Sequence, residues 1–370
     1  MQHLIIAHFC SLIPSLSFSY KRSIWLLHLS ALVPYNYLRS FMRAKYVALL
    51  LLTLAVSITA SNDMQLTTYQ TNLTVSGGVV SSAQDLYGRY LMVASGNTFT
   101  FWTRISGKHF DTSQKVTIND TILEAIFSWT TLDAVAIGTT TTKLYLLAQQ
   151  NRTYVLSQTL ELSQKPTSLA WSVNCNTVLV GLSNGSITVF SKDPFLGTFA
   201  WSQVINTSHT SVAKLVGITS RFASCGSNDS VVNVYFYNLT TQQFTLNQSL
   251  TDSMTGNCSS LEMSIWEDRI VVGRSSGDIY TYSANYSLLY SKEYSLLHAH
   301  NASVRFVKLT FDNAILLSGS GDGNLSLWTV ANNFTTAATQ SINATAADWN
   351  YYYMEYTVAD NSSNVTVFRL

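Results

Sequence analysis

Charged side chains are scarce in this sequence: Asp, Glu, Lys and Arg together make up 11% of its 370 residues. No cluster of Lys and Arg remains after residue 61, so nucleic acid is a poor candidate partner. Only four prolines occur, and no Gly/Ser linker or charge block divides the chain. Residues 62–370 are therefore expected to form one compact domain whose surface is made polar by Ser, Thr, Asn and Gln.

Acidic residues are absent from residues 1–62, and all 20 lie from Asp63 onward. Within this leader, MRAK at residues 42–45 is a basic start, and the apolar stretch YVALLLLTLAVSITA ends in small residues near Ala60. This pattern predicts a secretory signal peptide at residues 42–61, too short for a membrane span. On this interpretation translation begins at Met42, and residues 1–41 are not part of the protein. In the alternative, Met1 is the start and the leader imports the protein into an organelle.

Removal of residues 1–61 takes away five of the 21 basic residues and none of the 20 acids, leaving a net charge of −4. The C-terminal sequence NVTVFRL carries no retention signal, no lipid-anchor tail and no second apolar span. The mature protein is expected to have no membrane span and to be soluble, either secreted or in the lumen of the endomembrane system.

Catalytic and metal-binding patterns are also missing from residues 62–370. The histidines left there have no Cys, Asp or Glu at metal-ligand spacing: His109, His209, His298 and His300. No Gly-rich phosphate loop and no G-x-S-x-G elbow occurs. The adjacent acids Glu267 and Asp268 are expected to lie in a solvated turn after Trp266. We therefore expect no cofactor, no metal and no enzymatic activity.

Cysteine is nearly absent too. Cys10 lies in the leader, which leaves Cys175, Cys225 and Cys258, and an odd number cannot all pair within one chain. The repeat described next places Cys225 and Cys258 near the same face, so we predict a disulfide between them and a free Cys175.

The sequence does contain one motif that returns seven times between residues 85 and 370. A short apolar strand ends in a small turn of Gly, Ser, Asn or Asp, and a second strand follows that closes on a large apolar or aromatic residue. These closing residues are Trp102, Leu147, Phe190, Tyr235, Tyr282, Trp328 and Phe368, at intervals of 45, 43, 45, 47, 46 and 40 residues.

A second anchor precedes the closing residue by 16 to 19 positions in five of the seven units. There an apolar strand is predicted to end in a Trp or Phe, and the polar residue that follows begins a turn. The five anchors are Trp129, Trp171, Trp266, Phe311 and Trp349, and Tyr87 and Ile218 are the best placements in the other two units.

A period of about 40–45 residues with several short strands per unit is typical of a β-propeller blade. One unit cannot cover both faces of its own small sheet, so neighbouring blades must stack. The sequence predicts an all-β, seven-bladed propeller. The segment from Met64 to Val75 alternates like a strand, and we expect it to complete the last blade and close the ring.

The sixth unit, HAHNASVRFVKLTFDNAILLSGSGDGNLSLWTV at residues 298–330, resembles the WD40 repeat. The resemblance implies a propeller fold, protein partners and a buried hydrogen-bond network. That network would be formed by His300, by Ser318 or Ser320, by Asp322 and by Trp328. The unit departs from the family pattern at Ala299 and Thr329, and the other six units are predicted to lack the His. In period and anchors the resemblance extends over residues 64–370.

Sequons for N-glycosylation are unusually frequent. Of the 25 asparagines, 16 begin Asn-x-Ser/Thr. Together with the leader, this excess favours the secretory route. Ten sites are predicted as candidates: Asn72, Asn119, Asn151, Asn206, Asn238, Asn247, Asn285, Asn301, Asn333 and Asn343. The other six sequons begin at Asn184, Asn228, Asn257, Asn324, Asn361 and Asn364, and Asn184 is also typical of a hairpin turn.

These observations favour a secreted, N-glycosylated propeller that is a platform for protein contacts. Two alternatives stay open: a propeller that binds or processes carbohydrate, and an intracellular WD40 scaffold whose sequons are unused. Since sugars block contacts, a partner is expected where the inner turns carry no sequon, at Gly96 and Asn97 and at Thr139 and Thr140.

Overall fold

The computed structural model divides the chain after Asp63, and residues Met64–Leu370 form one unit. It describes residues 67–369 except 86, 106–108, 129–133, 139–140, 173–175, 218–219, 252–254, 286, 331–332 and 351–353. The predicted leader and signal peptide, residues 1–61, and Cys175 lie outside the described residues.

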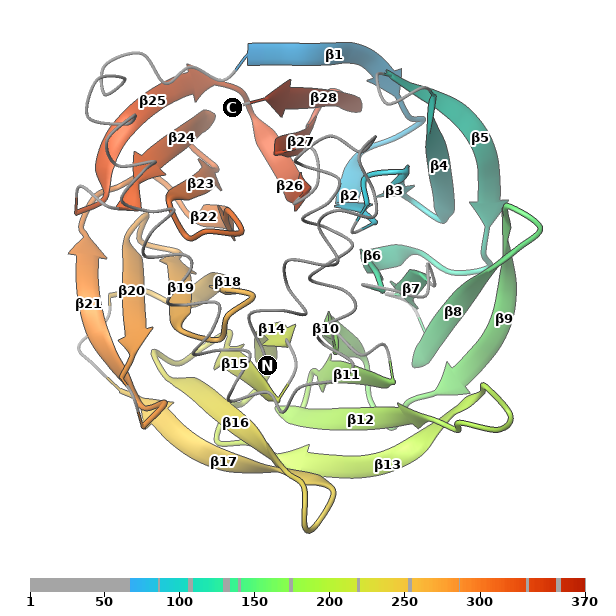
Figure 1. Ribbon diagram of the computed structural model, residues 1–370, viewed down its shortest axis with the longest axis horizontal. Helices are drawn as coiled ribbons and strands as arrows, with labels where there is room; N and C mark the ends of the chain where they lie inside the picture. The colour runs from blue at the N-terminus through green and yellow to red at the C-terminus, as the bar shows by residue number, and fades with distance from the viewer. Residues whose placement is uncertain are drawn as a thin grey trace, which may run out of the picture. The chain divides into compact units, whose positions relative to one another are not determined.

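Within these residues, 28 strands pair into seven antiparallel sheets of four strands each. The sheets stand around a central axis, with the first strand of each sheet nearest the axis and the fourth on the circumference (Figure 1). The all-β propeller that the repeat predicts is confirmed.

The first four sheets follow one another along the chain. Sheet 1 contains β2 (Val79–Gln84), β3 (Tyr90–Ser95), β4 (Thr98–Ile105) and β5 (His109–Thr117). Sheet 2 contains β6 (Ile122–Phe127), β7 (Ala134–Gly138), β8 (Lys143–Gln150) and β9 (Thr153–Glu161). Sheet 3 contains β10 (Pro166–Trp171), β11 (Thr177–Leu182), β12 (Ser186–Lys192) and β13 (Phe199–Asn206). Sheet 4 contains β14 (Val212–Gly217), β15 (Arg221–Gly226), β16 (Val232–Asn238) and β17 (Gln243–Leu250).

The last three sheets include the one that joins the two ends of the domain. Sheet 5 contains β18 (Cys258–Met263), β19 (Arg269–Arg274), β20 (Ile279–Ala284) and β21 (Tyr290–Leu296). Sheet 6 contains β22 (Val304–Leu309), β23 (Ile315–Ser320), β24 (Asn324–Thr329) and β25 (Thr335–Ser341). Sheet 7 contains β26 (Ala344–Asn350), β27 (Glu355–Asp360), β28 (Asn364–Arg369) and, as its fourth strand, β1 (Thr67–Thr74).

The seven closing residues all lie on the third strand of their sheet, and each is at most 7% exposed. They pack with the apolar second strands in clusters between neighbouring sheets. Two glycines show how close the sheets come. A Cβ atom on Gly181 or Gly273 would lie 2.6 Å from the side chain of Val212 or Val304, respectively, on the next sheet. The stacking of blades therefore requires a residue without a side chain there.

The predicted second anchors do not share one structural position. Trp171 and Trp349 lie at the ends of inner strands and are buried, whereas Trp266 and Phe311 lie in the turns beyond β18 and β22 and are half-buried. The rings of Trp266 and Phe311 contact each other, with centroids 5.0 Å apart. Tyr87 also lies in a turn, and Trp129 and Ile218 lie outside the described residues.

The ring has two rims. Rim I comprises the turns between second and third strands and the loops that lead from an outer strand to the next sheet. Backbone hydrogen bonds join them, as from His300 N–H to Gly277 C=O (3.0 Å). Rim II comprises the turns between first and second strands and the outer hairpins between third and fourth strands. These are also bonded, as from Ala284 N–H to Asp268 C=O (2.8 Å).

Candidate functional site

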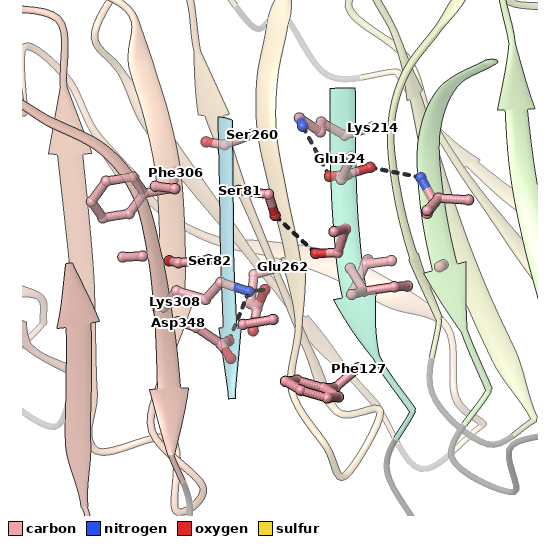
Figure 2. Close-up of a pocket in the computed structure, with 18 of the residues that line it drawn as sticks. Ser81, Ser82, Glu124, Phe127, Lys214, Ser260, Glu262, Phe306, Lys308 and Asp348 are labelled. Carbon is pink, nitrogen blue, oxygen red and sulfur yellow. Dashed lines mark hydrogen bonds and ion pairs between the residues drawn. The ribbon is translucent and has the colours of Figure 1, made fainter. Parts of the chain in front are cut away.

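The seven inner strands surround a central cavity of about 270 Å³ (Figure 2). A register shift follows the first residue of each inner strand, for example between Cys258 and Ser260 on β18 and between Val304 and Phe306 on β22. Such a bulge re-aims the side chains next to it. As a result, long charged side chains from several strands meet around the axis.

One group of these side chains joins β18, β22, β26 and β2. Lys308 Nζ lies 3.2 Å from a carboxylate oxygen of Glu262 and 3.8 Å from one of Asp348. The other oxygen of Asp348 accepts a hydrogen bond from Gln84 N–H (2.7 Å). Burial raises the pKa of Glu262 and of Asp348, and Lys308 only partly offsets it. For Lys308, burial lowers the pKa, but the two carboxylates outweigh burial and raise the pKa above its usual value.

A second group joins β6, β10 and β14. Glu124 accepts hydrogen bonds from Lys214 Nζ (3.2 Å), from Leu169 N–H (2.7 Å) and from Ser168 Oγ (3.1 Å). Ser168 Oγ in turn accepts from Leu215 N–H (3.1 Å). The charges of Glu124 and Lys214 balance each other. Figure 2 shows this group apart from the one around Lys308.

The predicted WD40 network is present in sheet 6. Trp328 Nε1 donates to Ser318 Oγ (2.8 Å), and Ser318 Oγ is also 2.8 Å from His300 Nε2. His300 Nδ1 lies 3.4 Å from a carboxylate oxygen of Asp322. Because the Asp322 carboxylate can only accept, the neutral His300 holds its proton on Nδ1, and its Nε2 accepts from Ser318 Oγ. Of the two candidate serines, Ser318 is the member, because Ser320 donates to Ala302 C=O.

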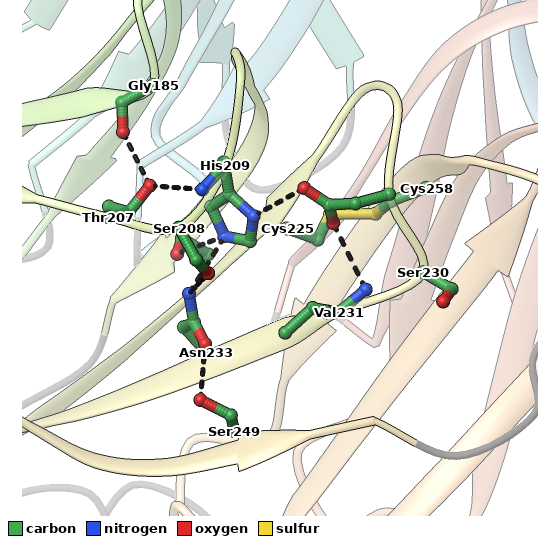
Figure 3. A network of polar contacts seen from close by, with 12 residues as sticks. Gly185, Thr207, Ser208, His209, Cys225, Ser230, Val231, Asn233, Ser249 and Cys258 are labelled. Atoms are coloured by element: carbon green, nitrogen blue, oxygen red, sulfur yellow. Dashed lines mark hydrogen bonds and ion pairs between the residues drawn. A yellow bond between two sulfur atoms is a disulfide. The ribbon is translucent and has the colours of Figure 1, made fainter.

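The prediction that the other six units lack the His is wrong for sheet 4. His209, only 4% exposed, lies before β14 as His300 lies before β22. Its Nδ1 is 2.9 Å from Asp229, and its Nε2 is 3.0 Å from Ser224 Oγ (Figure 3). The closing residue Tyr235 takes the place of Trp328. The signals in the sequence were His209 before the inner strand and Asp229 in the following turn.

Burial shapes the titration of the sheet 6 network. Burial lowers the pKa of the His300 imidazole, and Asp322 only partly offsets this effect. For Asp322, burial raises the pKa, but hydrogen bonds from Asn301 and Asn324 N–H together with His300 outweigh it and hold the pKa below its usual value. His300 is therefore neutral and structural rather than poised for proton transfer.

The structure contains a disulfide between Cys225 on β15 and Cys258, the first residue of β18, with Cα atoms 6.0 Å apart. It ties sheet 4 to sheet 5 beside the His209 network (Figure 3). Asn257, exposed, directly precedes Cys258, so the sugar acceptor of that sequon adjoins a bonded cysteine.

The sequons lie mostly at the surface. Thirteen of the 16 asparagines are exposed, Asn238 and Asn324 are half-buried, and the side chain of Asn72 is not described. Ten lie on rim I: Asn119, Asn184, Asn206, Asn228, Asn257, Asn301, Asn324, Asn343, Asn361 and Asn364. Four lie on outer hairpins of rim II (Asn151, Asn238, Asn285 and Asn333), and Asn72 and Asn247 lie on outer strands.

The predicted partner surface is not as free of sequons as the sequence implied. Gly96 and Asn97 are exposed, but their carbonyls accept hydrogen bonds from the loop that carries Asn119 (Ile118 N–H to Asn97, 3.0 Å; Ile122 N–H to Gly96, 2.7 Å). That loop follows the outer strand of sheet 1, and its place beside the turn could not be read from the sequence. Thr139 and Thr140 lie outside the described residues.

Neither a metal site nor a membrane-spanning helix is found in the described part of the chain. It holds no group of three or more His, Cys, Asp or Glu side chains that could bind a metal ion. No helix within it has the length and apolar character needed to span a bilayer.

Comparison with known proteins agrees with the geometry of sheet 6. The family described as "WD domain, G-beta repeat" matches residues 291–329, which include β22, β23 and β24 and all four residues of the His300 network. This chain is a WD40-repeat β-propeller. Such propellers commonly bind proteins, and the WD40 repeat here lies in the sheet whose network is most complete. No curated protein matches the chain.

Proposed function

We propose that this WD40 propeller is a secreted, N-glycosylated platform that binds a protein partner without catalysing a reaction. Its ring of seven sheets, closed by β1, would hold the rims fixed while the turns present side chains. The leader at residues 42–61 and the exposure of thirteen sequon asparagines support this proposal.

The observation that carries the proposal is the unequal distribution of sequons. Rim I holds ten of them, whereas the seven turns between first and second strands, on rim II, hold none. Attached sugars are bulky and would cover rim I. The inner turns of rim II would stay open to a partner.

These inner turns also present side chains suited to a protein contact. Tyr87, Trp266 and Phe311 are half-buried there, and Met354 is 57% exposed. Aromatic residues and Met are enriched in the cores of protein interfaces, where a few of them supply most of the binding free energy. We infer that the partner is a protein that covers this ring of turns. The sector predicted from the sequence, at Gly96, Asn97, Thr139 and Thr140, is the rival surface.

A sugar introduced on each rim tests the choice. The double substitution D312N/A314T creates the sequon Asn-Asn-Thr on an inner turn of rim II, and both replaced side chains are exposed. Asn at position 312 can still accept the hydrogen bond from Ala314 N–H that Asp312 accepts now. T140N creates Asn-Thr-Thr in the rival sector, between β7 and β8 in the sequence. D312N alone creates no sequon and is the unglycosylated control.

The partner is first identified by pull-down of the glycosylated protein, and its binding to purified variants is then measured. We expect glycosylated D312N/A314T to lose binding, while D312N and T140N retain it. Loss with T140N alone would place the partner on the rival surface. Retention in all variants would refute both surfaces.

A further inference from the structure

The lining of the central cavity combines charged and apolar side chains. On β18, β22 and β26 it is lined by Glu262, Lys308, Asp348 and Arg305. On β2, β6 and β14 the lining includes Val80, Leu123, Ile126 and Val216. Val80 and Leu123 are 41% and 37% exposed, so apolar surface is open within the cavity. A ligand that contacted both the charged and the apolar side chains would itself be amphipathic.

Charges of opposite sign are left unbalanced at two places along β22, around Lys308 and at Arg305. Around Lys308 two carboxylates face one ammonium group, which leaves one negative charge in surplus. Arg305 donates to Asn343 Oδ1 (2.8 Å) and Ala344 C=O (3.0 Å), which are uncharged, and it has no carboxylate partner among the described residues. Arg305 and Lys308 are three residues apart, or about 10 Å along the strand. The cavity thus holds a surplus positive charge and, further along β22, a surplus negative one.

Unbalanced charges that are partly withdrawn from water are costly, and a bound group of opposite charge offsets the cost. The remaining pair, Glu124 and Lys214, is balanced and adds no net charge. A ligand therefore needs an ammonium group, a carboxylate and an apolar group in one small molecule. The volume of about 270 Å³ lies just below the roughly 300–1,000 Å³ of pockets for drug-sized ligands, as a smaller ligand requires.

We propose that the cavity binds a free amino acid with an apolar side chain. Its ammonium group would contact Glu262 and Asp348, its carboxylate would contact Arg305, and its side chain would cover Val80 and Leu123. The N-terminus of a peptide offers the same ammonium group and side chain but lacks the nearby carboxylate. This inference depends neither on the sugars nor on a protein partner, so it stands apart from the proposed platform function.

Calorimetric titration of the mature, glycosylated protein tests the site. L-Leucine, L-leucinamide and N-acetyl-L-leucine are compared, because the second lacks the carboxylate and the third lacks the ammonium group. We expect L-leucine to bind, and each blocked form to bind about tenfold more weakly or worse, since each loses a charge-assisted contact. Equal binding of L-leucine and L-leucinamide would assign the site to peptide N-termini and refute the role of Arg305.

Two variants make the test specific without disturbing the Lys308 group. R305Q should bind L-leucine and L-leucinamide equally, whereas K115Q, a change of the same kind on the exposed outer strand β5, should behave as the wild type. L123S should weaken the binding of L-leucine by about tenfold and leave the binding of glycine unchanged, because only the contact with the apolar side chain is lost. Unchanged thermal unfolding checks that the variants fold. No heat from millimolar leucine, isoleucine or phenylalanine would show that the cavity holds only water and would overturn the proposal.

Discussion

The hydroxyl group of Ser318 joins two buried partners, since it accepts from Trp328 Nε1 and contacts His300 Nε2. In S318A the indole N–H would lose its acceptor, and a buried donor without a partner costs about 1–3 kcal/mol. Urea denaturation should show a loss of unfolding free energy in that range. S326A is a control on the same sheet, because Ser326 Oγ has only a long contact of 3.4 Å, to Thr339. An equal loss in both would show that the network has no special role.

The free energy of unfolding should depend on pH through the titration of His300. Its pKa is lowered in the folded protein by burial, so below about pH 6.5 the unfolded chain binds the proton more readily than the folded one. Stability therefore falls as the pH falls from 7 to 5. We expect H300Q, which has no such group, to lose less unfolding free energy than the wild type over this interval. Denaturation curves at both pH values would measure the difference, and parallel losses would contradict the assignment.

In the buried polar networks, residues were predicted from the sequence only where the complete motif was present. The four WD40 residues of sheet 6 could be identified because His, Ser, Asp and Trp all occur at family spacing. In sheet 4, Tyr235 replaces the Trp, and His209 stands three residues before the inner strand rather than four. The equivalence of His209 and His300 is visible only in the structure, where each imidazole contacts a serine of the second strand and an aspartate of the turn that follows it.

The inner strands are linked to one another by side chains except at one place. Glu124 links β6 to β10 and β14, Ser81 Oγ donates to Ala125 C=O between β2 and β6, and the Lys308 group links β18, β22, β26 and β2. Among the described side chains, no hydrogen bond or ion pair joins β14 to β18. The disulfide between Cys225 and Cys258 crosses this same junction between sheets 4 and 5.

Removal of the disulfide should therefore destabilise the domain. The bond closes a loop of 33 residues, for which the chain-entropy estimate is about 3–4 kcal/mol. We expect C225A/C258A to lose about this much unfolding free energy. C175A is the matched control and should keep the stability of the wild type, since the sequence leaves Cys175 without a partner. A double variant as stable as C175A would show that the junction holds without the bond.

The third strands were the easiest elements to predict, because a turn of small residues precedes a short strand that carries one large, buried apolar or aromatic residue. The inner strands were harder. Their anchors were placed by distance from the closing residue, and the structure instead puts Trp266 and Phe311 in turns of rim II. An aromatic residue at the end of an inner strand and one in the turn beyond it lie within three residues of each other in the sequence. The distance from the anchor to the closing residue varies by the same amount, from 16 to 19 residues, so it was not used to tell the two positions apart.

At the scale of the whole molecule, β1 pairs with β28 although nearly 300 residues separate them, as in the pair Thr68 and Phe368. Deletion of residues 62–76 would remove this strand and the buried Leu73, and it would leave β28 as an open edge. We expect a loss of at least about 2 kcal/mol of unfolding free energy, the low end for removal of a buried leucine side chain. Deletion of residues 62–66 alone is the control, because it leaves β1 intact. Full thermal stability in the longer deletion would refute the idea that β1 locks the ring.

The cavity could not be predicted from the sequence. Glu262, Lys308 and Asp348 are 46 and 40 residues apart, and each occurs once in its unit without a motif around it. Only the stacking of sheets 5, 6 and 7 brings these three strands side by side, and a bulge in each strand re-aims the side chains next to it. The same holds for the rims, because the sequence shows which turns carry sequons but not which turns meet.

The most direct test of a secreted, glycosylated platform is the N-terminal sequence and mass of the protein before and after enzymatic removal of N-glycans, for a chain expressed in secretory eukaryotic cells. We predict that the protein is recovered from the medium, begins near Asn62, and loses the mass of several glycans on treatment. Recovery only inside the cell, with the leader still attached and the mass unchanged by treatment, would contradict the account.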